Sequence, residues 1–389
     1  MKNASKLILF DLILSLSTGR WGSWFGIPEK GIFLIDIILL FAVLVAIYEG
    51  ELSIPSLGFA IVFAYVIWQF ARNPSAPVIL RVRDLLPFLY LIVFWMLRNS
   101  IKRIPKDSLM KGLRFASAFS LAWNIPVSLD VIKPFMLNPF SGIEVFSQRP
   151  DHAGVVAGIG CLVWGSSWAY PKGNNRQLLQ TSFPYLFVIQ TLLTSGRAGL
   201  IAVSLCFIYS IFLDNISEKV RRKKIQFFAI GVFFLLVGPT VLKLLPENSS
   251  FARLGLVSTN ELAAQAGQGT ASARKIAADI VIKWTKDNKR MLIGAGPGYE
   301  ILSESGAVKW LSGALDVRYP HNWWLSLYSR YGIFGLILWN YYLFKFWAIP
   351  SNLRHYKTPI IISLLLVATL GVIFESPFGL WPLFFFLFR

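Results

Sequence analysis

Long apolar runs, separated by polar connections, are the feature that most limits how this chain can fold. Several of them fall short of the roughly 20 residues that span a bilayer, and local thinning, tilt or partial re-entry would accommodate the shorter ones. Because the runs are too long and too numerous for soluble cores, we expect an all-α, polytopic membrane protein with about 12 transmembrane helices. The runs lie at residues 7–18, 32–48, 54–70, 85–97, 109–131, 153–170, 178–194, 198–213, 225–245, 323–349, 359–374 and 378–388.

The composition agrees with this expectation. Only 15% of the 389 residues are charged, the mean hydropathy is +0.57, and the net charge is +18. A soluble domain carries about 25% charged residues. Because the basic residues lie mostly between apolar runs, anionic lipid headgroups or lipid phosphates are expected to bind them, and nucleic acid is not. The two cysteines, Cys161 and Cys206, lie in apolar runs and are expected to be buried thiols outside any disulfide or metal site.

The basic residues also predict an orientation. If the runs alternate in direction, the main basic clusters fall on one side, which the positive-inside rule assigns to the cytoplasm together with both chain ends. Three arginines, Arg72, Arg81 and Arg83, run against this trend. No Ala-x-Ala-like cleavage site follows the first apolar run, so no cleavable signal peptide is expected. The basic clusters lie at residues 98–114, 172–176, 219–224 and 354–357.

With this orientation, residues 246–320 form one large extracytoplasmic loop. The chain then divides into helices 1–9 at residues 1–245, the loop, and helices 10–12 at residues 321–389. The outer loop is polar and too long for a tight turn.

Two segments of the outer loop have a recognisable pattern. The run 271–284 is amphipathic and carries Ile276, Ile280 and Trp284 on one stripe. Such a helix either rests on the membrane surface or covers a site. The glycine run at residues 292–299 lies outside the cytoplasm and lacks the Lys-Ser/Thr ending of a nucleotide-binding loop, so we expect a flexible turn.

One of the three histidines, His321, stands where the outer loop enters the next apolar run. If a helix begins there, Gly332 and Gly335 fall near the face of His321 and allow a neighbouring helix to approach closely. By its position alone, His321 is equally compatible with an aromatic belt at the membrane interface, shared with Trp323 and Trp324.

Arg197 stands in a tight outer turn, Thr194-Ser195-Gly196-Arg197-Ala198-Gly199, between two apolar runs. It therefore lies at the outer membrane face. An arginine there either extends its side chain to lipid headgroups or points its planar guanidinium at a phosphate. Arginines at such depth are functional candidates.

Together these motifs resemble a known family. The spacing of His321-Asn322, Gly332 and Gly335 is similar to the signature of the O-antigen ligase and O-antigen polymerase superfamily. The order of the other features resembles it too: the Arg197 turn comes first, then a loop arginine, Arg274, ahead of the Gly-Ala-Gly stretch. The resemblance covers residues 181 to 341.

The resemblance implies a membrane glycosyltransferase of the GT-C-like type, with short helices in its outer loop. Such enzymes move a glycan from a polyprenyl-diphosphate carrier to an acceptor hydroxyl outside the cytoplasm, with inversion, in the bacterial inner membrane. It implies catalytic roles for His321, which takes or orients the acceptor proton, and for Arg197 at the diphosphate. No cofactor or metal is implied, because arginines supply the positive charge. The implied substrate-binding residues are Arg274, Asn322, Arg318 and Asp316.

Several alternatives stay open at this stage. The acceptor is a lipid core, a second lipid-linked glycan or a protein hydroxyl, as in a ligase, a polymerase or a protein oligosaccharyltransferase. The absence of an extra soluble acceptor-binding domain favours ligase or polymerase. A transporter or flippase for lipid-linked glycans predicts polar residues deep in several runs and internal repeats. Asp11 and Asp36 are the only acids clearly inside the early runs, and no repeat is evident. A purely structural scaffold leaves Arg197 and His321 unexplained.

Overall fold

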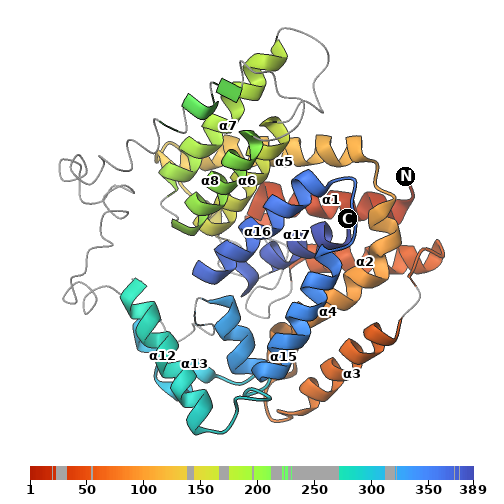
Figure 1. The fold of residues 1–389 in the computed structure, drawn as a ribbon, viewed down its shortest axis with the longest axis vertical. Helices are drawn as coiled ribbons and strands as arrows, with labels where there is room; N and C mark the ends of the chain where they lie inside the picture. Colours follow the sequence, from red (N-terminus) through yellow and green to blue (C-terminus); the bar gives the residue numbers. More distant parts are fainter. Residues whose placement is uncertain are drawn as a thin grey trace.

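Across the residues that it describes, the regular secondary structure of the computed structural model is helical except for one short strand pair, so the all-α expectation is confirmed (Figure 1). It describes residues 1–19, 21–22, 33–53, 56–137, 144–165, 175–194, 197–211, 221–222, 224–226, 229, 271–311, 320, 322–371, 373–375 and 377–389. The elements are α1 (Asn3–Thr18), α2 (Leu34–Tyr48), α3 (Leu57–Ala71), α4 (Val78–Lys102), α5 (Lys106–Ser128), β1 (Phe135–Leu137), β2 (Glu144–Val145), α6 (Pro150–Gly165), α7 (Asn175–Leu193), α8 (Arg197–Ile211), α12 (Ala271–Asp287), α13 (Ile301–Ser305), α14 (Val308–Leu311), α15 (Trp323–Trp347), α16 (Arg354–Leu370), η4 (Ile373–Glu375) and α17 (Pro377–Phe388).

The predicted runs and the observed helices correspond closely. Each apolar run before residue 214 and after residue 322 coincides with one helix, and the amphipathic run of the outer loop is α12. Nearly all of the run at 225–245 lies outside the described residues. The antiparallel pair of β1 and β2 was not expected. Within the ranges given above, no helix combines the length and the apolar character that crossing a bilayer requires.

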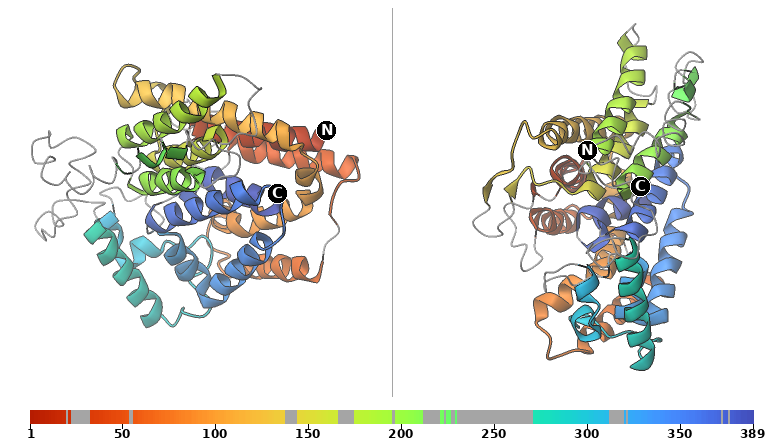
Figure 2. Two further views of the ribbon diagram at one scale, coloured as in Figure 1. Left: turned by 45° about the horizontal axis from the view of Figure 1, so that its top comes forward. Right: turned by 90° about the vertical axis from the view of Figure 1, so that its left-hand side faces the viewer.

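The centre of the fold is α17, which packs against α1, α4, α15 and α16 (Figures 1 and 2). The side chains from Phe378 to Phe388 are buried. Trp381 packs edge-on against Phe94 of α4, and its indole nitrogen donates a hydrogen bond to the carboxylate of Asp11 in α1 (2.8 Å). The acidic residue in the first apolar run is therefore paired inside the protein.

One end of the molecule brings together both termini and the α4–α5 connection. The carboxylate of Glu51, which follows α2, forms ion pairs with Lys2 and Arg103. Arg389 follows α17, and its guanidinium donates to the backbone carbonyl of Lys102 (2.5 Å). The first basic cluster of the sequence therefore lies beside both chain ends.

The helices within residues 271–311 form a second, smaller core. Ala277 and Val281 on α12 are fully buried against α13, α14 and the start of α15, where Leu325 joins the same cluster. Ile280 and Trp284, from the predicted stripe, are partly buried in this cluster. The amphipathic run is therefore a helix with one face packed on the protein.

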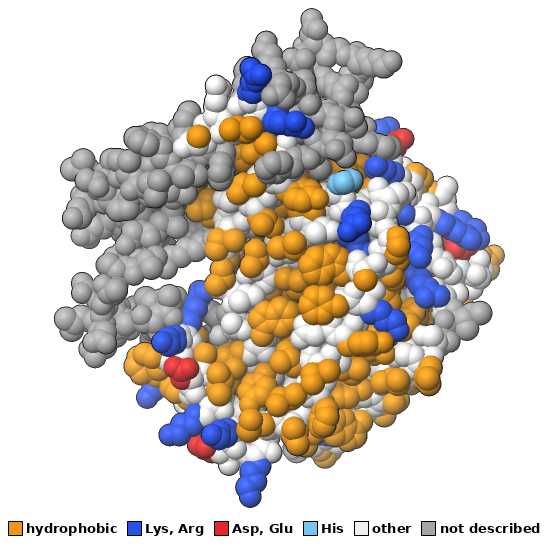
Figure 3. Space-filling model, viewed as in Figure 1, with side chains coloured by type: hydrophobic (Ala, Val, Ile, Leu, Met, Phe, Trp, Pro, Cys, Tyr) orange, Lys and Arg blue, Asp and Glu red, His pale blue; other side chains and the backbone are white. Residues whose placement is uncertain are grey.

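Exposed apolar side chains gather on α2, α3 and α15. Figure 3 shows a broad apolar field across the face that includes α15, with Lys and Arg side chains at its borders. The exposed side chains are Leu40, Phe41, Leu44 and Ile47 of α2, Leu57, Ile61, Phe63 and Ile67 of α3, and Phe334, Ile337, Tyr341 and Phe344 of α15. A soluble monomer rarely exposes an apolar patch of this extent.

Candidate functional site

Two of the predicted site residues meet at the C-terminal end of α16. The amide of Asn322 caps α15, since its oxygen accepts from the backbone N–H of Leu325 (3.0 Å). The nitrogen of the same amide donates to the carbonyl of Thr369 (3.1 Å). Arg274, near the start of α12, donates to the next carbonyl, that of Leu370 (2.6 Å). The last carbonyls of a helix carry partial negative charge and lack partners within the helix, so both contacts are favourable.

The N-terminal ends of α6 and α8 reach the same place. Gly154 and Gly199 pack so closely that a Cβ on Gly154 would lie 2.1 Å from the Cα of Gly199. A Cβ on Gly371, just after α16, would lie 2.3 Å from the carboxylate of Asp151. We call this region, formed by residues 150–154, 197–199, 274, 322 and 369–371, the helix-end junction. The N-terminal ends of helices α6, α8 and α12 add positive potential here, while the last carbonyls of α16 and the carboxylate of Asp151 add negative charge.

The remaining predicted site residues are only partly described. The backbone of Arg197 begins α8 and so belongs to the helix-end junction. His321, Arg318 and Asp316 lie outside the described residues. The structure therefore brings Arg274, Asn322 and the start of α8 together.

Helix α15 breaks at Gly332, whose backbone (φ 67°, ψ −169°) is non-helical. The glycine run of the outer loop packs against this break. Its Ala295 N–H donates to the carbonyl of Ser329 (2.8 Å), and the N–H of Ile333 donates to the carbonyl of Met291 (2.9 Å). The run supplies partners for backbone groups that the break frees.

The glycine run is also held from its other side, so its interpretation as a flexible turn was wrong. Arg72, just after α3, donates to the carbonyls of Ile293 and Gly294, the second at 2.7 Å. Asn73 donates to the carbonyls of Ala295 (3.1 Å) and Pro297 (3.0 Å). Side-chain donors distant in sequence hold the carbonyls of the run, and composition carries no signal of this pairing.

The two glycines of the α15 motif therefore have different neighbours. Gly332 faces the backbone of the glycine run, where we expected a neighbouring helix. Gly335 does face a helix, because a Cβ there would lie 2.5 Å from the hydroxyl of Tyr65 on α3. The prediction that a neighbouring helix approaches closely is confirmed at Gly335. At Gly332 it is wrong, because the segment that approaches is the glycine run.

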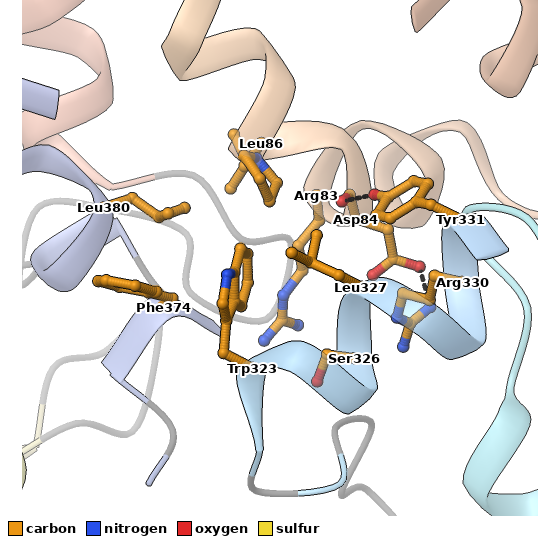
Figure 4. Close-up of a pocket in the computed structure, with 11 residues that line it drawn as sticks. Arg83, Asp84, Leu86, Trp323, Ser326, Leu327, Arg330, Tyr331, Phe374 and Leu380 are labelled. Atoms are coloured by element: carbon orange, nitrogen blue, oxygen red, sulfur yellow. Dashed lines mark hydrogen bonds and ion pairs between the residues drawn. The ribbon is translucent and has the colours of Figure 1, made fainter. Parts of the chain in front are cut away.

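A buried ion pair joins α4 to α15 (Figure 4). The guanidinium of Arg330 contacts the carboxylate of Asp84, and their side chains are 3% and 0% exposed. The same carboxylate accepts from the backbone N–H of Gly298 (2.7 Å), and Arg330 also donates to the carbonyl of Tyr299 (3.2 Å). Sequence reasoning missed this pair. Two charged residues beside or within apolar runs were the available signal, because such residues are rarely left without a partner.

His152 lies at the N-terminal end of α6, one residue before the apolar run 153–170. Its ring is 7% exposed and packs beside Phe378 at the start of α17. Burial, together with the charge of Arg149, lowers the pKa of His152 to about 4. Within the part of the chain that the structure describes, its Nε2 atom has no hydrogen-bond partner. The imidazole is therefore neutral at neutral pH.

Cys161 and Cys206 are free and buried, as expected. Across the described residues, no group of His, Cys, Asp and Glu side chains has an arrangement that could hold a metal ion.

The comparisons with known proteins identify one family. The family model described as O-antigen ligase matches residues 185–340. This segment contains the Arg197 turn, α12, the glycine run and the His321-Asn322 pair that opens α15. The comparison with curated proteins gave no match.

Proposed function

We propose that the chain, whose residues 185–340 match the family model described as O-antigen ligase, is a membrane glycosyltransferase of cell-surface polysaccharide assembly from the O-antigen ligase and O-antigen polymerase superfamily. It moves a glycan from a polyprenyl-diphosphate carrier to an acceptor hydroxyl. The acceptor belongs to a lipid core or to a second lipid-linked glycan.

One observation carries this proposal most directly. The motif residues Arg274 and Asn322 contact adjacent carbonyls at the end of α16. The start of α8, which holds Arg197, is tied to the same end through α6. Motif pieces separated in the sequence thus form one junction, where helix N-terminal ends add positive potential suited to a diphosphate.

The chemistry of the transfer assigns a role to each residue. The acceptor oxygen attacks the anomeric carbon, the bond from that carbon to the phosphate oxygen breaks, and the lipid diphosphate leaves. His321 receives the acceptor proton, as a neutral imidazole can near neutral pH. Arg197 and Arg274 stabilise the negative charge that grows on the diphosphate, with Arg318 as a further contact and Asp316 orienting His321. Attack opposite the leaving group inverts the anomeric centre.

We further propose that the chain crosses the bacterial inner membrane, with the helix-end junction outside the cytoplasm. The exposed apolar side chains of α2, α3 and α15 support contact with lipid (Figure 3). The gathering of both termini with the first basic cluster at the other end supports a cytoplasmic location for that end. Arg72 and Arg81 run against the charge trend, and contacts within the protein account for them. Arg72 binds the glycine run, and Arg81 donates to the carbonyl of Phe70 (2.9 Å).

The decisive experiment is glycan transfer by the purified full chain in nanodiscs. The donor is a polyprenyl-diphosphate oligosaccharide, and candidate acceptors are added separately. His321→Ala and Arg197→Ala are expected to lower the rate by roughly 10²-fold or more, as the loss of a general base or of a charge-stabilising donor does. Arg354→Ala is the matched control, because Arg354 is an exposed arginine at the opposite end of α16. It should transfer normally.

The product pattern distinguishes the two activities. A ladder of chain lengths indicates a polymerase, and a single shifted acceptor indicates a ligase. Near-wild-type transfer by His321→Ala would refute the role of His321. Movement of the lipid-linked glycan across the bilayer without bond formation would instead support a transporter.

A further inference from the structure

The turn that leads from α12 into the glycine run places basic side chains directly before exposed apolar ones. We call residues 286–293 the α12 turn. Its first half carries the basic residues Lys286, Lys289 and Arg290 and one acid, Asp287. Its second half is Met291, Leu292 and Ile293, whose side chains are all exposed. A short segment with a charged half and an apolar half suits the boundary between water and lipid.

The apolar half of the α12 turn continues the exposed apolar surface of α3 and α15. The backbone N–H of Phe334, just after the break in α15, donates to the carbonyl of Leu292 (3.2 Å), and both side chains are more than half exposed. Arg72 follows α3, and its guanidinium lies 5.3 Å from the ring centre of the exposed Trp68. Figure 3 shows Lys and Arg side chains at the lower border of the apolar field, on the side where α12 ends in Figure 1.

Arg290 is fixed in position by two aromatic rings. Its guanidinium carbon lies 5.4 Å from the ring centre of Trp284 and 4.5 Å from that of Tyr299. Such cation–π contacts orient the planar group without using its N–H donors. Among the residues that the structure describes, this guanidinium donates no hydrogen bond and forms no ion pair. Its donors are therefore available to a phosphate, which a guanidinium can bind with two parallel hydrogen bonds.

A second arginine, Arg72, lies beside the same turn. It donates to the carbonyl of Gly294 (2.7 Å), and the N–H of Gly294 donates to the carbonyl of Arg290 (2.7 Å). Burial, together with the charge of Arg290, lowers the pKa of Arg72. Within the described ranges no carboxylate pairs with either guanidinium. Two neighbouring positive charges without a counter-ion favour an anion beside them.

The backbone at Lys289 supports a role for its charge outside folding. Its φ of 54° lies in the left-handed region, where glycine or asparagine is usual after the end of a helix. A lysine there adds strain that glycine would relieve. The position thus combines a local cost with a positive charge next to Arg290.

We propose that the α12 turn binds the phosphate headgroup of an anionic membrane phospholipid, with the acyl chains lying along the exposed apolar side chains of α3 and α15. Arg290 donates to the phosphate, and Arg72 and Lys289 add positive charge. A soluble phosphate would leave Leu292 and Phe334 without contacts. The inference rests on the proposed membrane location and is independent of glycan transfer.

A fluorescent label at the α12 turn tests the inference locally. Leu292→Cys is labelled with bimane in the full chain, and Cys161 and Cys206 are too deeply buried to compete for the label. The labelled protein in detergent is titrated with chain-brominated phosphatidylglycerol and, separately, with chain-brominated phosphatidylcholine, whose bromines quench the label on contact. The anionic lipid should reach half-quenching at about tenfold lower concentration, because several basic side chains face its headgroup.

Two variants in the labelled background locate the headgroup. Arg290→Gln removes the free guanidinium and should raise the half-quenching concentration of phosphatidylglycerol about tenfold. Lys289→Gly removes one charge and should raise it about fivefold. Its thermal midpoint should not fall, because glycine relieves the left-handed strain, so a purely structural role of Lys289 predicts no loss of lipid binding.

The matched control is Lys309→Gln. Lys309 also lies over an aromatic ring, with its Nζ atom 5.8 Å from the ring centre of Trp310. It belongs to α14, which is described in full and exposes no large apolar side chain. The control should therefore bind phosphatidylglycerol like the labelled parent.

A competition distinguishes a membrane phospholipid from the carrier lipid of the proposed reaction. Farnesyl diphosphate serves as a short polyprenyl diphosphate, and inorganic diphosphate serves as the control for its charge. If the turn binds a phospholipid, farnesyl diphosphate should relieve quenching no better than inorganic diphosphate does. Clearly better relief by farnesyl diphosphate would assign the turn to the carrier and overturn the inference.

Every other outcome also decides. Quenching that is selective for the anionic lipid, weakened by Arg290→Gln and Lys289→Gly and kept by Lys309→Gln, supports the site. Absent quenching, equal quenching by the two lipids, or unchanged quenching in both variants overturns it. If Arg290→Gln fails to fold, Lys289→Gly decides alone. Glycan transfer without lipid selectivity refutes only this site, and lipid selectivity without transfer refutes only the proposed reaction.

Discussion

Gly294 and Gly332 lie on two segments that pack so closely that neither position has room for a side chain. A Cβ on Gly332 would lie 2.3 Å from the carbonyl carbon of Leu292, and one on Gly294 would lie 2.2 Å from the carbonyl carbon of Arg330. Both glycines have positive φ angles. The glycine run at residues 292–299 and the break in α15 therefore pack backbone against backbone as one structural unit.

The first prediction concerns this unit. Gly332→Ala should lower the free energy of unfolding by about 3 kcal/mol or more, because it adds left-handed strain to a backbone clash. Gly306→Ala is the control. Gly306 has a similar φ of +73°, but nothing lies within 4 Å of its missing Cβ, so it should cost only about 1 kcal/mol of strain. Equal losses, measured by chemical denaturation in detergent, would contradict the close approach.

The second prediction concerns the buried pair of Asp84 and Arg330. Arg330→Met leaves a buried carboxylate and should cost about 3–5 kcal/mol of folding free energy. The double variant Asp84→Leu/Arg330→Met should recover part of that loss, with a coupling of roughly 2 kcal/mol in a double-mutant cycle. Additive losses would mean that the two side chains do not stabilise each other.

The third prediction distinguishes the role of Asn322 as the cap of α15 from its proposed role beside the diphosphate. Asn322→Ala removes the helix cap and should cost about 1 kcal/mol of stability. Asn322→Asp keeps an acceptor for the N–H of Leu325 but replaces the donor to the carbonyl of Thr369 by a carboxylate oxygen, so the free energy of unfolding should fall by about 1–3 kcal/mol. Its negative charge would repel a diphosphate, and the rate of glycan transfer should fall about tenfold or more. Wild-type transfer by Asn322→Asp would place the diphosphate away from the helix-end junction.

The fourth prediction is a pH dependence of stability from His152. Its pKa in the folded protein, about 4, lies below the ordinary value of 6.5, so the unfolded chain binds the proton more readily. The stabilisation is therefore fully present above pH 6.5 and is lost as the pH falls from 6.5 toward 4, by up to about 3 kcal/mol. The thermal midpoint between pH 7 and pH 4.5 measures this loss. His152→Phe, which cannot titrate, should show a smaller decline, and an equal decline would exclude His152 as its source.

Most of the helices could be predicted because the spacing of apolar residues and the length of an apolar run can be read from a short stretch of sequence. The α12 stripe and the cap at Asn322 are examples, since each needs only a few neighbouring residues to be recognised. The meeting of Arg274 and Asn322 was implied only by the family resemblance. Residue pattern alone gives no distance between two segments.

The features that escaped prediction depend on pairing between distant segments. The Asp84–Arg330 pair joins residues far apart in the chain, and a single sequence holds no record of that pairing. The break at Gly332 escaped for the same reason. A glycine inside an apolar run also fits an unbroken helix, and only the arrival of the glycine run makes the break favourable.

The burial of α17 has a consequence for biosynthesis. This helix fills the space between α1, α4, α15 and α16, yet it follows all of them in the chain. A ribosome adds residues at about 5–20 per second, so the earlier helices are exposed for seconds before α17 is made. Until then Asp11 lacks the indole of Trp381. The packed interior therefore closes only after α17 has been made, and until then the earlier helices expose the apolar surface that α17 covers.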